Sequence, residues 1–191
     1  LWYLRIMKTT STLLLATLLA LVGCSSDFPV TVHLDETWTD AEIVVIESAF
    51  QEWETATGGM MQYELVRGFS HHFDAKEDYF RDDVHVLYRL NASEMETFRV
   101  ARGRDIAPVG ATSNISAGIG NVIVIAIDAL PTDVDLWNTM AHELGHFYGF
   151  ENHVEGTLMA EAHTQQDCID AVTVERVCEV HGCDARPTCT E

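Results

Sequence analysis

The sequence predicts an α+β domain in which helices cover a twisted, mixed sheet of about five strands. Short alternating or apolar runs typical of strands recur between residues 30 and 127. Two long segments and one segment near the C-terminus carry apolar residues at helical spacing. The chain has 191 residues, 47% of them apolar and only 4 of them proline, so it can bury one sizeable core and is not a disordered acidic chain.

The first half of the domain is expected to contain three strands and one long helix. Val30–Leu34 alternates like a half-buried strand. The helix is predicted to begin at Thr39, because Glu42 three residues later completes the pattern of a capping box. Apolar residues then recur at helical spacing until Gly58, which ends the helix. The second and third strands are expected at Met61–Val66 and Val84–Tyr88.

The second half is expected to add two strands and the remaining helices. Ser93–Arg102 is ambiguous between a short helix and a loop. Gly110–Gly118 is small and polar, which suits an exposed edge strand, whereas the apolar run Asn121–Ile127 is typical of a strand buried on both faces. A long helix is predicted from about Val134, and a final helix over Asp170–Val180.

The chain is strongly acidic. It has 11 Lys and Arg against 30 Asp and Glu, a formal net charge of −19. This charge repels the phosphates of nucleic acids and the headgroups of anionic lipids. We therefore expect no nucleic-acid partner.

The N-terminal region has the order of an export signal. Lys8 precedes the apolar run Leu13–Val22, which is too short to span a bilayer, and small residues lead to Cys24. This order resembles a bacterial lipoprotein signal, whose cysteine is acylated and becomes the mature N-terminus. A buried N-terminal helix is the alternative. The resemblance implies a signal peptide at 1–23, a short tether at 24–29 and the folded domain at 30–191.

The residue after Cys24 bears on location. It is Ser25 and not aspartate, which by the same resemblance favours the outer membrane over the inner one. We therefore expect a protein of the bacterial cell envelope that is lipid-anchored at the outer membrane, on its periplasmic or surface face.

Four further cysteines lie near the C-terminus. An even number of cysteines in an exported protein predicts two disulfides, and three pairings are possible. A small zinc knot that also uses His181 is the alternative, although no C-x-x-C spacing is present. The residues are Cys168, Cys178, Cys183 and Cys189.

The helix expected from about Val134 contains the run His142–His146, which is His-Glu-Leu-Gly-His. Histidines at i and i+4 lie one turn apart on one face, so both imidazoles can reach one metal ion. Glu143 projects beside them, where its carboxylate can take a proton from metal-bound water without binding the metal. We expect this polar face to point outward. The opposite face should pack on the strand at 121–127 through Trp137, Met140, Ala141, Leu144 and Phe147.

Three features after this run complete a known pattern. Gly149 can adopt the left-handed conformation that ends a helix, His153 offers a third imidazole, and Met159 follows within a short loop. Together these residues resemble the metzincin zinc endopeptidases, whose pattern is H-E-x-x-H-x-x-G-x-x-H followed by a Met-turn. The run itself is most similar to the matrixin-type branch and its bacterial relatives.

The resemblance extends from Val30 to Met159 and implies a metzincin-like zincin fold. It also implies Zn²⁺ as the cofactor, Met159 as the Met-turn residue beneath the zinc ligands, and an extended substrate that pairs with the edge strand at Gly110–Gly118.

The chain departs from the family pattern at one position. Three residues after the glycine it has Asn152 where the pattern has histidine, and His153 comes one residue later. Zinc prefers imidazole nitrogen to a neutral amide, and a loop accommodates one extra residue at little cost. We therefore expect His142, His146 and His153 to bind zinc. Asn152 as the third ligand, or His153 as a bystander, remains an alternative.

These residues predict a monomeric zinc-dependent endopeptidase that hydrolyses peptides or proteins by a zinc-activated water, with Glu143 as general base. Two alternatives remain. A thermolysin-like zincin would take its third ligand from Glu161 or Glu175, and a non-catalytic zinc-containing envelope lipoprotein would bind peptides without cleaving them. The pair His71-His72 is a less favoured metal-binding candidate on a polar segment.

Overall fold

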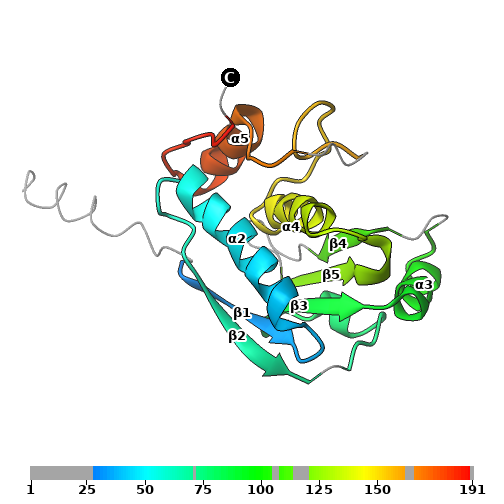
Figure 1. Ribbon diagram of the computed structural model, residues 1–191. Helices are drawn as coiled ribbons and strands as arrows, with labels where there is room; N and C mark the ends of the chain where they lie inside the picture. Colours follow the sequence, from blue (N-terminus) through cyan, green and yellow to red (C-terminus); the bar gives the residue numbers. More distant parts are fainter. Residues whose placement is uncertain (1–27, 71, 105–107, 114–120, 162–165, 190–191) are drawn as a thin grey trace, which may run out of the picture.

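The computed structural model describes residues 28–70, 72–104, 108–113, 121–161 and 166–189. A five-stranded mixed sheet runs through this part of the chain in the order β2-β1-β3-β5-β4 (Figure 1). Four strands are parallel, and β4 pairs antiparallel with β5 at one edge. The strands are β1 (Val30–Asp35), β2 (Tyr63–Phe69), β3 (His85–Leu90), β4 (Gly110–Ser113) and β5 (Val122–Ala126).

In the described part of the chain, four α-helices and two short 3₁₀ turns accompany the sheet. The predicted α+β fold is confirmed, and the ambiguous segment at Ser93–Arg102 is a helix. The expected edge strand is also found at the edge of the sheet, although residues 114–118 of it lie outside the described part. The helices are α2 (Asp40–Ala56), α3 (Ala92–Ala101), α4 (Asp133–Phe147) and α5 (Ala171–His181), and the turns are η1 (Asp78–Phe80) and η2 (Ile127–Ala129).

The two faces of the sheet carry two separate apolar cores. Alternate residues of β5 illustrate the division, because Ile123 and Ile125 belong to one core while Val122 and Val124 belong to the other. The larger core joins the sheet to α2, α4 and α5, and the smaller one joins it to η1 and α3. All five residues of β5 are buried, so the prediction that this strand is covered on both faces is confirmed.

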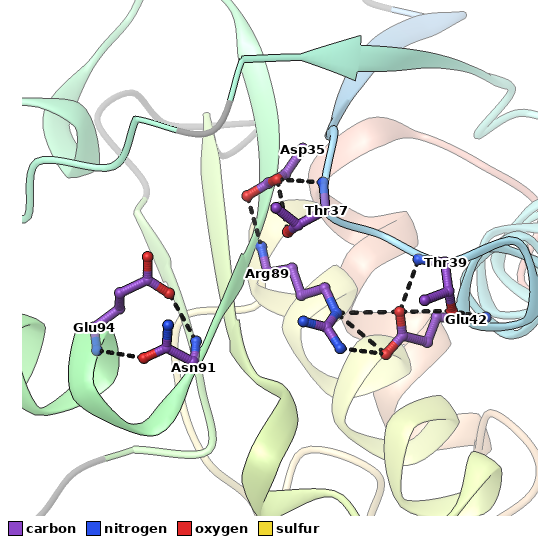
Figure 2. Close-up of polar contacts among 7 residues, drawn as sticks. All are labelled: Asp35, Thr37, Thr39, Glu42, Arg89, Asn91 and Glu94. Carbon is purple, nitrogen blue, oxygen red and sulfur yellow. Dashed lines mark hydrogen bonds and ion pairs between the residues drawn. The ribbon is translucent and has the colours of Figure 1, made fainter.

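Polar contacts tie the N-terminus of α2 to the sheet (Figure 2). The predicted capping box is present: Thr39 accepts a hydrogen bond from Glu42 N, and the Glu42 carboxylate accepts one from Thr39 N. Arg89 of β3 then forms an ion pair with Glu42 at 3.0 Å. Asn91 and Glu94 form a second capping box at the start of α3. These contacts fix where both helices leave the sheet.

The C-terminal tail is bonded to α5 and to the segment before it. Cys178 pairs with Cys183 and Cys168 pairs with Cys189. The prediction of two disulfides is confirmed. The zinc-knot alternative is wrong, because the four sulfur atoms are bonded in two disulfide pairs.

Several predictions concern residues outside the described part of the chain. They are the signal peptide, Cys24 with the first part of its tether, and His71. Within the described ranges, no helix combines the length and the apolar character needed to cross a membrane.

Candidate metal centre

Helix α4 brings two of the candidate ligands into place. It begins where the Thr132 side chain accepts a hydrogen bond from Asp135 N, and it ends at Tyr148. Gly149 follows with φ of +94°, the left-handed conformation expected of it. Phe150 N donates to Gly145 O at 2.9 Å, which closes a Schellman motif and turns the chain back along the helix.

The imidazoles of α4 are held by backbone carbonyls on one ring nitrogen each. His142 Nδ1 lies 2.9 Å from Leu158 O, and His146 Nδ1 lies 2.6 Å from Phe150 O. Since a carbonyl only accepts, each Nδ1 carries the hydrogen and each Nε2 keeps its lone pair. Burial lowers the pKa of His146, which favours the neutral ring that a metal needs.

The third imidazole comes from the loop after α4. His146 Nε2 and His153 Nε2 lie 3.2 Å apart, and one ligand atom from each of His142, His146 and His153 lies within 4.8 Å of the others. Two Zn–N bonds of about 2.0–2.1 Å at the tetrahedral angle separate their nitrogens by about 3.3 Å. The three-histidine site is therefore compatible with zinc.

Glu143 lies beside the histidines and is covered by the edge strand. Glu143 is only 4% exposed. A Cβ added to Gly110 of β4 would lie 2.7 Å from Glu143 Oε1, and Thr112 Oγ1 lies 2.6 Å from Glu143 Oε2. Burial raises the pKa of the Glu143 carboxyl to about 7, against the opposing effects of the Thr112 hydrogen bond and the positive charge of Arg104.

The loop from Phe150 to Ala160 packs against the underside of α4. Met159 is fully buried, and a Cβ added to Gly145 would overlap its Sδ atom. Leu158 N donates to Asp170 Oδ2 at 2.8 Å, while Asp170 Oδ1 caps α5 by accepting from Thr173 N. The segment that orients His142 is therefore anchored to the first turn of α5.

A cavity of about 400 Å³ opens over this centre. Glu143, His146 and His153 line it on one side, and residues 110–112 of β4 line it on another. Phe150, Glu151 and Arg104 complete the wall. His146, His153, the Glu143 carboxyl and the edge strand thus share one cavity that is accessible to a ligand.

No known family profile matches the sequence, and no curated protein is similar to it in sequence. Among solved structures, the chain is similar to high choriolytic enzyme 1, a hatching enzyme zinc-protease from the medaka fish Oryzias latipes. The identity is 11%, the TM-score is 0.42, and the match covers 84% of this chain and 93% of that one. This similarity is too distant to assign a family.

The structure brings together the histidines of the predicted pattern and separates the rival candidates from them. His142, His146 and His153 form one group, and Asn152 lines a different cavity. Among the described residues, no other group of three or more His, Cys, Asp or Glu could hold a metal. The other candidate ligands are not part of this group; they are Glu161, Glu175 and His72.

One expectation about the helix is wrong. The polar face of the motif was expected to point outward, but His142 and Glu143 are each only 4% exposed. The reason is tertiary, because β4 covers Glu143 and the returning loop contacts His142 through Leu158 O. The opposite face packs in the core as expected.

Sequence reasoning missed three residues that shape the centre. Gly110 admits the Glu143 carboxyl, Thr112 donates to it, and Asp170 holds the loop. Asp170 followed three residues later by Thr173 is a helix N-cap signal, but nothing in it points to Leu158. The contacts of Gly110 and Thr112 with Glu143 depend on how the edge strand β4 packs against α4.

Proposed function

We propose that this chain is a zinc-dependent endopeptidase of metzincin type, with His142, His146 and His153 as zinc ligands. One observation carries the proposal: three imidazoles place one ligand atom each within 4.8 Å of the others, and two of them, His146 and His153, line a cavity with a buried glutamate that is not part of the group. His153 is favoured over Asn152 because its Nε2 already lies at ligand spacing from His146 Nε2. Met159, packed against Gly145, supports the helix beneath the ligands.

Zinc bound here would polarise the scissile carbonyl and acidify a water molecule. The residues of the chain supply the rest of the chemistry. Glu143 accepts the proton of the attacking water at a carboxylate oxygen, and its raised pKa suits a base that must later release the proton. The same carboxyl then donates that proton to the leaving amine. Leu158 O and Phe150 O hold the imidazoles in one tautomer throughout.

The edge strand supports an extended peptide as the substrate. β4 lies at the edge of the sheet, and its residues 110–112 form a wall of the cavity next to Glu143. A peptide that lies along this wall brings a backbone carbonyl close to the three imidazoles. No feature of the cavity favours a purely binding role, and a buried general base beside the histidines favours hydrolysis.

The experiment is a peptide-library digestion by the full chain, before and after a chelator and again after zinc is restored. We expect internal peptide bonds to be cleaved, cleavage to stop with the chelator, and zinc to restore it. Cleavage that survives complete zinc removal would refute the proposed chemistry. A chain that binds one zinc and cleaves no peptide would favour the binding lipoprotein.

We also propose that Cys24 carries a lipid that anchors the domain to the outer membrane. The sequence supports this through the order of Lys8, an apolar run and small residues before the cysteine. Two acyl chains are enough for stable anchoring, whereas a chain of net charge −19 gains nothing from anionic headgroups. Fractionation of Cys24→Ser cells tests this, since a variant that stays in the membrane after a high-salt wash contradicts it.

A further inference from the structure

The edge strand makes a specific hydrogen bond to the proposed general base. Thr112 Oγ1 lies 2.6 Å from Glu143 Oε2 and 3.0 Å from Glu143 O. On the same strand, Gly110 leaves room for the other carboxyl oxygen, because a Cβ there would lie 2.7 Å from Glu143 Oε1. Strand β4 therefore bonds one oxygen of the carboxyl through Thr112 and leaves room for the other at Gly110.

Thr112 is itself held by its backbone carbonyl. Val109 O and Ser113 O accept hydrogen bonds from the β5 side, from Ala126 N at 2.7 Å and Asn121 N at 3.0 Å. Because carbonyls alternate along a strand, the carbonyl of Thr112 points away from β5, toward the free edge.

The side chain of Tyr79 hydrogen-bonds to the carbonyl of Thr112. Its hydroxyl donates to Thr112 O at 2.7 Å, and its ring lies 5.0 Å from the ring of Phe98, in the smaller core. Tyr79 is only 4% exposed, and burial raises its pKa to about 12, so the hydroxyl keeps its hydrogen. Tyr79 thus fixes the backbone of Thr112 while the Thr112 side chain reaches Glu143.

We propose that Thr112 is a positioning residue for the peptide hydrolysis, and that its hydroxyl holds the Glu143 carboxyl in place during proton transfer. This inference rests on the proposed function. The ionised carboxylate accepts the hydroxyl hydrogen at Oε2. When Glu143 takes the proton from water at its other oxygen, Oε2 still accepts the hydrogen of the Thr112 hydroxyl, and the new carboxyl O–H stays available for the leaving amine. One hydroxyl can therefore hold the carboxyl both before and after the transfer.

A purely structural role for Thr112 makes a different prediction. If the residue only packs β4 against α4, valine, which has the same shape, replaces it without loss, and serine leaves a small void. If the hydroxyl positions Glu143, serine retains the function and valine does not. Thr112→Val and Thr112→Ser therefore separate the two roles.

The test uses the full chain loaded with zinc, and measures kcat, KM, zinc content and thermal stability for both variants. We expect Thr112→Val to lower kcat by about 10- to 100-fold, the loss typical of a hydrogen bond to a charged group, with KM and zinc content unchanged. Thr112→Ser should stay within about threefold of the unchanged chain. A Thr112→Val variant of full kcat, or a Thr112→Ser variant as slow as it, overturns the inference.

Tyr79→Phe provides a second, independent variant should Thr112→Val fail to fold. It removes only the hydroxyl behind Thr112, and we expect a smaller decrease in kcat, of about two- to tenfold. An unchanged kcat would mean that Thr112 needs no support from Tyr79, and would contradict the arrangement proposed.

Crystal structures of the metal-free variants give a readout that does not depend on activity. We expect the Glu143 carboxyl to keep its position in Thr112→Ser and to leave it in Thr112→Val. An unmoved carboxyl in Thr112→Val overturns the positioning role even if the chain is a peptidase. Absence of cleavage by the unchanged chain, with the carboxyl displaced in Thr112→Val, would instead overturn only the proposed function.

Discussion

Helix α4 and the loop Phe150–Ala160 supply the same centre in contrasting ways. The helix is fixed by the larger core, in which its apolar face is almost completely buried, and its His142 is only 4% exposed. The loop is fixed by a few hydrogen bonds, by Asp170 and at its two ends by Phe150, Leu158 and Met159 in the same core, but its middle is open and His153 is exposed. The helix sets the geometry of the site, and the loop completes it.

The difference explains how the proposed site accommodates one residue more than the metzincin pattern that the sequence resembles. An insertion within α4 would rotate His146 by about 100° away from His142. The same insertion between Gly149 and His153 only lengthens a turn, and His153 still lies 3.2 Å from His146, nitrogen to nitrogen. The predictions below test the two halves of the site: the helix half, which is α4, and the loop half, which is Phe150–Ala160.

Glu143→Gln tests the helix half and should have the largest effect. We expect cleavage to fall by about 10²- to 10⁴-fold, because glutamine cannot accept the proton of water. Zinc content should remain unchanged, since Glu143 serves the water and not the metal. The matched control is Glu175→Gln, an exposed glutamate of α5, which should keep full activity. Loss of zinc from Glu143→Gln would show that Glu143 is a ligand.

His153→Ala tests the loop half against its neighbour. We expect its zinc affinity to fall by more than about 100-fold, because one of three imidazoles is removed. Asn152→Ala should bind zinc like the unchanged chain. Competition with a chromogenic chelator measures both affinities. Equal affinities, or the greater loss from Asn152→Ala, would reverse the assignment of the third ligand.

Gly145→Ala tests the contact between the helix and the loop. In a free helix this substitution stabilises by about 1 kcal/mol. Here the added methyl group overlaps Met159 Sδ, so we expect the free energy of unfolding to fall by about 1–3 kcal/mol in urea denaturation. Adding Met159→Ala should recover part of this loss, because the new methyl group fills the vacated space. A more stable Gly145→Ala variant would contradict the tight packing.

Asp170→Ala tests how the loop is anchored and should have the smallest effect. We expect a loss of about 0.5–2 kcal/mol of stability from the missing N-cap, and a decrease in zinc affinity of about tenfold as the Leu158 segment loosens. Asn91→Ala removes the N-cap of α3, away from the centre, and should cost similar stability without any change in zinc affinity. Equal zinc affinities in Asp170→Ala and Asn91→Ala would show that the anchoring of the loop by Asp170 does not affect metal binding.

The sequence predicted the helix half of the site better than the loop half. Spacing of four residues places His142 and His146 on one face regardless of the rest of the chain, and Gly149 marks the end of α4. The capping box at Thr39 and the apolar strand β5 are local signals of the same kind. Local patterns therefore sufficed for the elements and their order.

The rest depends on contacts between distant segments. The burial of Glu143 follows from β4, about 30 residues earlier, and the anchor of Leu158 comes from Asp170. The pairing of four cysteines could not be chosen from their spacing either, because the fold decides which sulfur atoms meet. No local pattern carries this information.

The most direct measurement of the central claim is zinc X-ray absorption spectroscopy on the full chain with one equivalent of zinc. If α4 and the loop share one metal, the spectrum should show three imidazole nitrogens at about 2.0–2.1 Å and one oxygen ligand. His153→Ala should show two imidazoles. Two imidazoles in the unchanged chain, or sulfur or additional carboxylate ligands, would contradict the three-histidine centre.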